Sequence, residues 1–243
     1  MSSSQPSKQR VVAVTGASRG IGAAIAFELA ARGCTVGCLT RQGSGPDHQS
    51  FIHLACDVTD TVSIRHALAT LAERAGGIDG LVNNAGIHLD GKSHELSTEV
   101  FDQVMGTNAR AVFVACREAY PYLARAGGTI VNIGSFFDKL GVKRNLAYCA
   151  SKAAVGAITR CLAVEWAAQK IRVLDVAPGY IETELNAAAM RGPLRAFLQA
   201  RVPSGGPGSV NDVARLVAAL CCEEIPFLTG ETIYLDGGQG MAH

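Results

Sequence analysis

The chain has 243 residues, 48% of them hydrophobic, and its 22 Lys and Arg residues nearly balance 21 Asp and Glu residues. This length and composition suit one α/β domain or two small ones with a large core, and they disfavour a disordered chain. The charge balance excludes a strongly basic nucleic-acid-binding surface. The sequence contains no apolar stretch of about 18 residues, so we expect no membrane-spanning segment.

The eight cysteines are scattered through apolar stretches, where a free thiol behaves as a small hydrophobic side chain. They form neither a C-x-x-C pair nor the spacing of a zinc site, so we expect no metal. The opening residues, MSSSQPSKQR, lack the apolar run and cleavage site of a secretory signal. We therefore expect a reduced, cytoplasmic protein with a flexible N-terminus over residues 1–9.

Apolar, β-branched runs alternate with helical patterns along the rest of the chain. Strands are expected at residues 10–15, 34–39, 51–55, 78–82, 128–133, 170–176 and 231–235. Helices are expected at residues 20–32, 60–75, 98–126, 147–168 and 209–222. This alternation predicts an α/β protein with a seven-stranded, mostly parallel sheet covered by helices on both faces. We expect residues 10–243 to form a single, doubly wound domain.

Two connections depart from this alternation. Residues 43–50, GSGPDHQS, are too short and too rich in helix breakers for a complete crossover helix, so a turn is expected. Residues 183–206 contain RGP and PSGGPG, which predict a mobile segment and no helix or strand. We expect the latter segment to act as a lid over a substrate.

The first expected strand runs directly into the glycine loop TGASRGIG, which has glycines at Gly16, Gly20 and Gly22. Glycines at a strand-to-helix junction allow a tight turn and let the backbone approach a pyrophosphate. The N-terminus of the following helix supplies free N–H groups and a positive dipole end. An ordinary glycine-bearing turn is the alternative, but the position at the first strand–helix junction favours dinucleotide binding.

The residues after the second expected strand bear on the choice of dinucleotide. An acid there would hold the 2′-hydroxyl of NAD, but no Asp or Glu occurs between Glu28 and Asp47. Thr40 and Arg41 occupy this place, and Arg19 of the glycine loop can approach from the other side. These residues favour the 2′-phosphate of NADP(H), with NAD(H) as the alternative if Arg41 is only a solvated loop residue.

Tyr148 and Lys152 lie four residues apart in NLAYCASKAA, within an expected helix. An ammonium group beside a phenol on one helix face favours the phenolate and lowers the pKa of the tyrosine. Taken alone, however, such a pair is typical of a solvated helix surface.

Further motifs follow the glycine loop in a fixed order. They are CDV at 56–58, NNAG at 83–86, TNA at 107–109, IVNIGS at 130–135, YCASK at 148–152, APGYIET at 177–183 and LDGG at 235–238. In this order and spacing the chain resembles the short-chain dehydrogenase/reductase family from residue 10 onward. It is most similar to standard-length NADPH-dependent members such as 3-oxoacyl-acyl-carrier-protein reductases and small carbonyl reductases.

The resemblance implies a catalytic set of Asn108, Ser135, Tyr148 and Lys152. In this family the lysine binds the nicotinamide ribose and lowers the pKa of the tyrosine. The tyrosine then protonates the carbonyl oxygen as hydride arrives at the carbon, or removes the alcohol proton in reverse. The serine hydrogen-bonds the same oxygen, and the asparagine holds a water that connects the lysine to solvent.

The resemblance also implies the cofactor contacts. Asp57 and Val58 are expected at the adenine, the NNAG segment at the adenosine ribose, and the APGYIET segment around the nicotinamide. A purely structural role, tying the central strands together, is the alternative for the NNAG segment. The full set of expected contacts is Gly16, Ser18, Arg19, Gly20, Ile21, Gly22, Thr40, Arg41, Asp57, Val58, Asn84, Ala85, Gly86, Tyr148, Lys152, Pro178, Gly179, Ile181 and Thr183.

The resulting hypothesis is an oxidoreductase that transfers hydride between NADP(H) and a carbonyl compound or secondary alcohol, such as a 3-oxoacyl thioester or small ketone. One alternative is an NAD(H)-dependent sugar or steroid alcohol dehydrogenase, and another is a non-catalytic dinucleotide sensor or scaffold on the same fold. Arg191, Arg195 and Arg201 of the lid are candidate contacts for an acidic group on the substrate.

Self-association is also expected. The helices at 98–126 and 147–168 carry long faces of small residues, which allow close helix–helix approach. Proteins of the family that the chain resembles form tetramers through these two helices. We therefore expect a homotetramer, or a homodimer.

Overall fold

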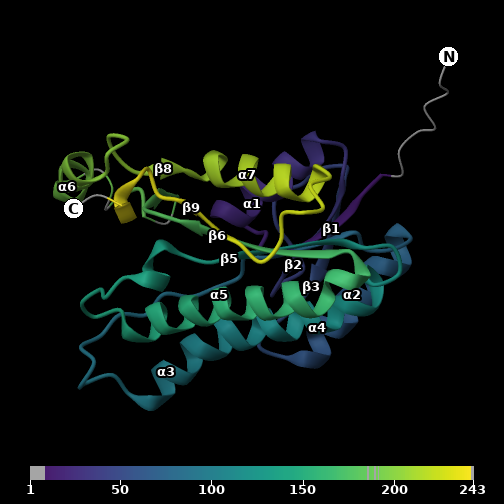
Figure 1. Cartoon of the computed structure of the whole chain (residues 1–243), viewed down its shortest axis with the longest axis horizontal. Coiled ribbons are helices and arrows are strands. Elements are labelled where there is room, and N and C mark those ends of the chain that lie inside the picture. Colours follow the sequence, from purple (N-terminus) through teal and green to yellow (C-terminus); the bar gives the residue numbers. More distant parts are fainter. Residues whose placement is uncertain (1–8, 185, 189, 191, 242–243) are drawn as a thin grey trace.

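The computed structural model describes residues 9–184, 186–188, 190 and 192–241. The expected flexible N-terminus lies outside the described residues except for Gln9, and the lid residue Arg191 also lies outside them. The predicted fold class is confirmed, because seven strands form one sheet with helices on both faces (Figure 1).

The sheet has the order β3-β2-β1-β4-β5-β6-β9, and each neighbouring pair of strands is parallel. The strands are β1 (Val11–Thr15), β2 (Thr35–Thr40), β3 (Phe51–Ala55), β4 (Gly80–Asn83), β5 (Gly128–Ile133), β6 (Ile171–Pro178) and β9 (Thr232–Leu235). The strand order reverses between β1 and β4. At such a switch point, open α/β sheets bind ligands in a crevice outside the carboxyl ends of their strands.

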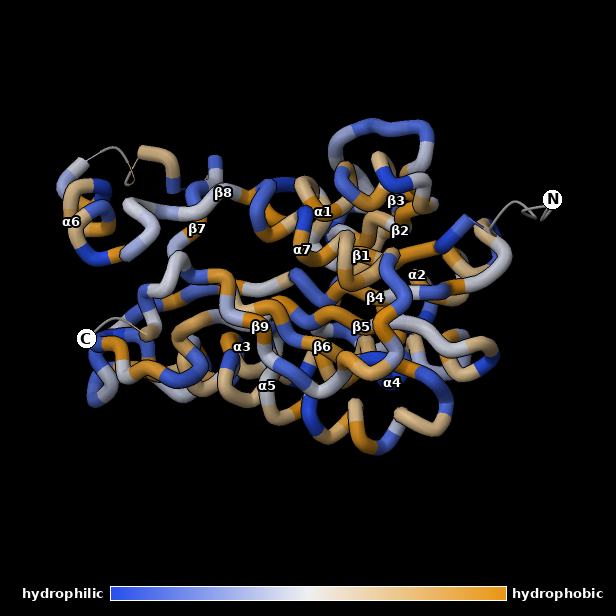
Figure 2. Tube along the Cα trace, turned by 45° about the horizontal axis from the view of Figure 1, so that its top comes forward, coloured by the Kyte–Doolittle hydropathy of each residue, from blue (hydrophilic) through white to orange (hydrophobic). Residues whose placement is uncertain are grey.

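Helices cover both faces of the sheet. Figure 1 shows α1 (Gly20–Ala31) and α7 (Val210–Cys222) together on one face, and α4 (Ala111–Leu123) and α5 (Leu146–Trp166) on the other with α2 (Thr61–Ala75). Residues of β1 alternate between the two cores, with Val11 and Ala13 facing one and Val12 and Val14 the other. Because both faces are buried, the central strands are continuously hydrophobic (Figure 2).

The expected helix at residues 98–126 is not a single regular helix. It consists of α3 (Thr98–Met105), a π-helical turn over Gly106–Arg110, and α4. A π-helical turn inserts one extra residue per turn, and such turns are frequent at functional sites. Here the turn carries Asn108, which the family resemblance places in the catalytic set.

The two irregular connections have different outcomes. Residues 43–50 form turns without a helix, as predicted. In the segment 183–206, where we expected no element, α6 (Pro193–Arg201) is a helix with a proline in its first turn. That expectation is wrong because the flanking Gly and Pro residues masked a short amphipathic pattern, in which Leu198 is completely buried. A second small sheet pairs β7 (Ile181–Glu182) with β8 (Gly208–Ser209). The mobility of this segment and its role as a lid stay predictions.

All eight cysteines are free thiols. Five of them are buried as small hydrophobic residues, and the Sγ atoms of Cys34 and Cys222 lie 3.6 Å apart. Among the described residues, no helix combines the length and the apolar character needed to cross a membrane.

Candidate active site

The glycine loop joins β1 to α1 in a conformation that requires glycine. Gly16 and Gly20 have φ angles of +68° and +56°, in the left-handed region that other residues rarely adopt. A Cβ atom at Gly22 would lie 2.2 Å from the carbonyl oxygen of Gly16, so no side chain fits there. The residue that precedes α1, Arg19, forms no side-chain cap, which leaves the first N–H groups of the helix available to an anion.

The NNAG segment at the end of β4 supports this loop. The side-chain amide of Asn84 donates hydrogen bonds to the carbonyl oxygens of Thr15 (3.0 Å) and Gly16 (3.2 Å). The backbone N–H groups of Asn84 and Ala85 donate to the hydroxyl of Thr15, each at 3.0 Å. The Asn84 side chain therefore has a structural role, and cofactor contacts by Asn84, Ala85 and Gly86 stay predictions.

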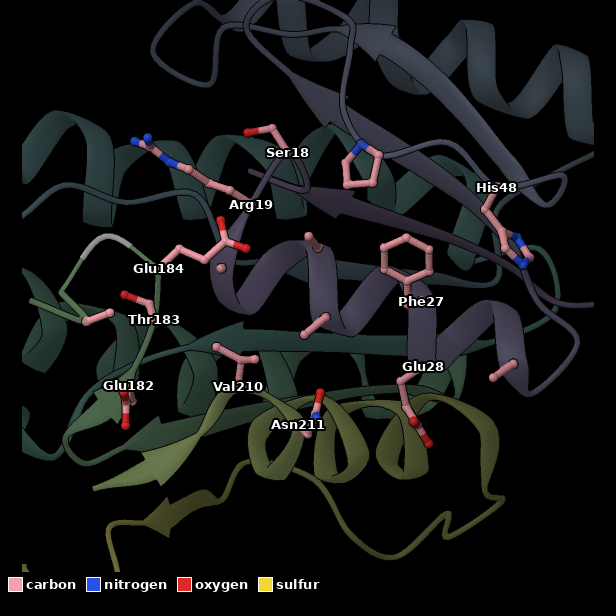
Figure 3. Close-up of a pocket in the computed structure, with 16 residues that line it drawn as sticks. Ser18, Arg19, Phe27, Glu28, His48, Glu182, Thr183, Glu184, Val210 and Asn211 are labelled. Carbon is pink, nitrogen blue, oxygen red and sulfur yellow. The ribbon is translucent and has the colours of Figure 1, made fainter. Parts of the chain in front are cut away.

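A cavity of about 900 Å³ opens from the glycine loop along α1. In Figure 3, Ser18, Arg19 and Glu184 lie at one end of this cavity, and Phe27 and His48 lie toward the other. The expected cofactor residues Ser18, Arg19, Gly20 and Thr183 line it, whereas the expected catalytic residues do not. The glycine loop, where the pyrophosphate of a dinucleotide is expected, is therefore accessible from this cavity. The residues of the expected catalytic set lie outside the cavity.

The residues at the end of β2 differ in their availability to a cofactor. The buried hydroxyl of Thr40 donates to the carbonyl oxygen of Ser44 (2.9 Å) and accepts from the N–H of Ser44 (3.1 Å). This side chain thus closes the turn after β2, and its contact with a phosphate stays a prediction. Arg19 and Arg41 are exposed, and neither side chain hydrogen-bonds to another described residue.

Asp57 and Val58 follow β3. Asp57 accepts hydrogen bonds from the N–H (2.9 Å) and the hydroxyl (2.7 Å) of Thr59. These bonds lower the pKa of Asp57, and the nearby Arg41 guanidinium lowers it further. Val58 packs against the hydrophobic core. Asp57 is therefore a carboxylate at neutral pH, and one of its oxygens already has two donors.

Ser135 and Tyr148 meet at the carboxyl end of β5. Ser135 precedes a 3₁₀ turn over Phe136–Lys139, and its Oγ accepts from the N–H of Phe137 at 3.3 Å. Tyr148 lies in the first turn of α5, beside the Ser135 side chain. Burial raises the pKa of Tyr148, and the nearby Ser135 side chain opposes this rise. The two residues expected to contact the reacting oxygen therefore adjoin each other.

Lys152 lies one helical turn after Tyr148 and is buried. Its ammonium donates to the carbonyl oxygen of Ile133 at 2.7 Å and lies 5.6 Å from the centroid of the Tyr148 ring. Burial lowers the pKa of Lys152 to about 8, while the Asp175 carboxylate acts in the opposite direction. The pKa of Tyr148 is therefore raised and not lowered, because burial of the phenol outweighs the effects that lower it.

Asn108 lies in the π-helical turn and is almost completely buried. Its side-chain oxygen accepts from the N–H of Ile87 (2.8 Å), and its amide donates to the carbonyl oxygen of Ile87 (2.9 Å) and to the Ser151 hydroxyl (3.1 Å). Asn108 thereby fixes the loop after β4 to α5, beside Lys152. A water held between Asn108 and Lys152 stays a prediction.

The expected nicotinamide residues lie at the end of β6 and just beyond it. Pro178 is the last residue of β6, and the Gly179 N–H donates to the carbonyl oxygen of Leu235 at 2.9 Å. Ile181 is buried in β7. The methyl group of Thr183 lies 4.0 Å from the position that a Cβ atom would take at Gly20. Thr183 therefore adjoins the glycine loop, and the contacts of these four residues with a nicotinamide stay predictions.

Aromatic rings surround Tyr148. The centroids of the His88 and Phe137 rings lie 4.7 Å and 6.1 Å from that of Tyr148, and the Tyr180 ring packs on Phe136 at 5.3 Å. His88 also hydrogen-bonds to Asn145. The approach to the phenol is therefore lined mainly by rings.

Two arginines of the segment 183–206 are engaged within the protein. Arg195 pairs with Glu182 at 3.3 Å, and Arg201 lies over the Phe197 ring at 5.9 Å from its centroid. These are the two described lid arginines that we considered as contacts for an acidic group.

Sequence reasoning missed two polar residues of the site. Ser151 hydrogen-bonds to Asn108, and Asp175 lies buried in strand β6 near Lys152. The signal for Asp175 was a single acid within the apolar run IRVLDVAP. The signal for Ser151 was weaker, because a serine in a helix of small residues has no distinguishing pattern.

The chain is similar to known proteins over almost its whole length. Residues 16–239 match the enoyl-(acyl carrier protein) reductase family. The chain is 36% identical to the 3-oxoacyl-acyl-carrier-protein reductase FabG of Escherichia coli strain K12, over 96% of this chain and 98% of the relative. It is 32% identical to a D-threitol dehydrogenase of Mycolicibacterium smegmatis, over 94% and 92%.

A solved short-chain type dehydrogenase/reductase from Mycobacterium marinum superimposes with a TM-score of 0.87 at 30% identity, covering 95% of each chain. These matches span the glycine loop, Ser135, Tyr148 and Lys152 together. The chain therefore belongs to the short-chain dehydrogenase/reductase family and is an NAD(P)-dependent oxidoreductase that acts on a CH–OH or C=O group.

Proposed function

We propose that the protein is an NADP(H)-dependent carbonyl reductase that interconverts a ketone and a secondary alcohol. The observation that carries this proposal is that Ser135 and Tyr148 adjoin each other beside a buried Lys152, at the carboxyl ends of the strands. The glycine loop lies at the same edge of the sheet. The nicotinamide, when bound, supplies or accepts the hydride.

The residues of the chain handle the proton and the charge on the oxygen. In the reductive direction the Tyr148 phenol donates its proton to the carbonyl oxygen, and the Ser135 hydroxyl hydrogen-bonds the same oxygen as negative charge develops on it. The positive charge of Lys152 favours release of the phenol proton. In the oxidative direction Tyr148 removes the alcohol proton.

The preference for NADP(H) rests on Arg19 and Arg41. Both guanidinium groups are exposed at the glycine loop and the end of β2, where the 2′-phosphate of the cofactor is expected. A guanidinium forms strong paired hydrogen bonds with a phosphate, whereas the 2′-hydroxyl of NAD(H) needs an acceptor. The described residues just after β2, from Arg41 to Pro46, include no acid.

A small, uncharged ketone is the substrate class that best suits the surroundings of Tyr148. Rings of His88 and Phe137 flank the phenol and offer few hydrogen-bond partners to a polyol. Arg195 and Arg201 have partners within the protein, so contact with an acidic carrier would require them to leave those partners. A 3-oxoacyl thioester is the second candidate, supported by the similarity to FabG.

We further infer a cytoplasmic homotetramer or homodimer. Ala153, Ala157, Cys161 and Val164 are exposed along one face of α5, and Phe113 is exposed on the neighbouring α4. Small exposed residues on α5 allow a second helix to pack closely against it. This packing would remove the exposed Val164 and Phe113 side chains from water.

The test is to follow oxidation of NADPH and of NADH, at equal concentrations, with a simple diketone. We expect turnover with a higher kcat/KM for NADPH. A higher kcat/KM for NADH, together with oxidation of sugar or steroid alcohols, would instead support the NAD(H)-dependent alternative. Tight nucleotide binding without turnover on any carbonyl or alcohol would contradict the proposal and indicate a dinucleotide sensor.

A further inference from the structure

Asp175 is a buried carboxyl group on β6, the strand next to the edge strand β9 of the sheet. It lies in β6, in register with Asn132 of β5 on one side and Thr232 of β9 on the other, and its exposed fraction is 0%. Among the fully or nearly buried side chains of the described residues, it is the single carboxyl group. A buried carboxylate is costly unless charges or hydrogen bonds compensate it.

The hydrogen bonds of Asp175 do not provide that compensation. The Thr232 hydroxyl donates to Oδ2 at 3.2 Å, and Oδ1 has no hydrogen-bond partner among the described residues. The adjacent Gly134 N–H helps to stabilise the ionised carboxyl, but its hydrogen bond goes to the carbonyl oxygen of Val176 at 2.8 Å. A Cβ atom at Gly134 would lie 2.5 Å from Oδ1, so glycine is needed to leave room for the carboxyl.

Lys152 approaches the same place from α5. Its ammonium is bound to the carbonyl oxygen of Ile133, which immediately precedes Gly134. Gly156 lies one helical turn after Lys152, and a Cβ atom at Gly156 would be 3.9 Å from Oδ2 of Asp175. The helix and the strand thus bring one buried cation and one buried acid together, each with too few hydrogen bonds of its own.

We propose that Asp175 is a positioning residue whose carboxylate keeps Lys152 protonated inside the protein. This inference rests on the proposed function, in which the positive charge of Lys152 assists proton transfer by Tyr148. A buried ammonium loses its hydration, and a nearby buried carboxylate replaces part of the lost stabilisation.

Other titratable groups face Asp175 less directly. Asp138 of the 3₁₀ turn accepts from the Tyr234 hydroxyl of β9 at 2.9 Å and 3.1 Å, so its charge is already engaged. Arg160 of α5 is exposed to solvent, which screens its charge. Lys152 is therefore the buried cation whose charged form Asp175 can stabilise. Asp175 is the buried acid whose negative charge can offset the positive charge of the Lys152 ammonium.

The pairing has a defined pH range. Burial raises the pKa of Asp175 to about 6 although Lys152 opposes the rise, and burial lowers the pKa of Lys152 to about 8 although Asp175 opposes the fall. Both groups are charged between these values. Below about pH 6 the wild-type carboxyl is itself neutral, so an uncharged amide at this position should change little there.

The experiment compares pH profiles of ketone reduction by the wild type, Asp175→Asn and a control, Asp102→Asn, which removes an exposed acid from α3. We expect Asp175→Asn to match the wild type below about pH 6 and to lose turnover progressively above it. Its alkaline limb should shift downward by about 1 pH unit, the usual effect of one nearby opposite charge. Asp102→Asn should follow the wild type throughout.

A purely structural role would lower activity by the same factor at every pH, and that result would overturn the inference. Side-chain nitrogen NMR of Lys152 tests it without relying on turnover or on the folding of a variant. In the wild type this resonance should titrate in two steps, near the pKa values of about 6 for Asp175 and about 8 for Lys152. A single step would contradict the pairing. Two steps in a protein without turnover would leave the pairing intact and reject the proposed function.

Discussion

The phenol of Tyr148 is subject to two opposing effects. Burial raises its pKa, and the neighbouring Ser135 side chain lowers it, with burial the larger effect. The positions of Ser135, Tyr148 and Lys152 could be predicted from the sequence, because the motif spacing places them just after β5 and on α5. The direction of the Tyr148 pKa shift and the burial of Asp175 near Lys152 could not be predicted, because both depend on how the sheet and helix pack.

Arg41 provides a test of cofactor choice at the scale of one residue. Arg41→Ala removes a charged hydrogen-bond donor from the expected 2′-phosphate site, and charged hydrogen bonds contribute about 1.5–3 kcal/mol. We therefore expect kcat/KM for NADPH to fall at least about tenfold, with kcat/KM for NADH nearly unchanged. Steady-state kinetics with both coenzymes measure this difference.

The matched control is Arg125→Ala, which removes an arginine that follows α4 and lies over the Tyr122 ring. It should alter neither coenzyme preference nor turnover. If Arg41→Ala lowered kcat/KM equally for NADPH and NADH, Arg41 would not bind the 2′-phosphate.

At the scale of elements, the glycine loop and α1 form one unit with the NNAG segment. Alternation of apolar runs predicted the seven strands of the main sheet to within about two residues, a usual boundary error. It failed at the π-helical turn, where the helical pattern continues on both sides of Asn108 and gives no sign of the extra residue. It also failed at α6, whose nine residues lie between stretches rich in Gly and Pro.

Gly22→Ala tests the close approach of α1 to the glycine loop. The added Cβ would lie 2.2 Å from the Gly16 carbonyl oxygen and 2.5 Å from the Asn84 amide nitrogen. We expect a loss of about 1–3 kcal/mol in the free energy of unfolding, typical of overpacking, together with weaker NADPH binding. Urea denaturation and a fluorescence titration with NADPH measure the two effects.

Gly106→Ala is the control for this substitution. Gly106 has helical φ and ψ angles of −58° and −47°, and nothing outside its own helix lies within 4 Å of an added Cβ atom. The change should leave NADPH binding intact and stabilise the protein by about 0.5–1 kcal/mol. If Gly22→Ala behaved like Gly106→Ala, the proposed tight packing of the loop would be wrong.

Across the whole molecule, the two helical layers cover the faces of the sheet and leave the carboxyl ends of its strands accessible to a ligand. The sequence predicted these layers because the central strands are continuously apolar, which requires cover on both faces. It could not predict the cavity along α1, whose shape depends on the conformation of the short turn at 43–50 and on Glu182, Thr183, Glu184 and Ala187. Nor does it fix the oligomeric state, since exposed small residues on α5 permit association without requiring it.

Val164 tests the proposed association through α5. This side chain is 81% exposed in the single chain, and a glutamate there would place a charge within the expected helix–helix contact. We expect the wild type to be a tetramer or dimer by light scattering and Val164→Glu to have a smaller mass. Val62→Glu, at a 66% exposed position of α2, is the matched control and should keep the wild-type mass. A monomeric wild type would contradict the proposal.

The central claim is that Tyr148 transfers the proton in an NADP(H)-dependent reduction. The most direct measurement compares NADPH binding and single-turnover ketone reduction by the wild type and Tyr148→Phe, which removes only the phenol oxygen. We expect NADPH affinity to stay close to the wild-type value and the reduction rate to fall by about 10²–10⁴-fold, the usual contribution of a general acid. A Tyr148→Phe variant that reduced the ketone at the wild-type rate would contradict the claim.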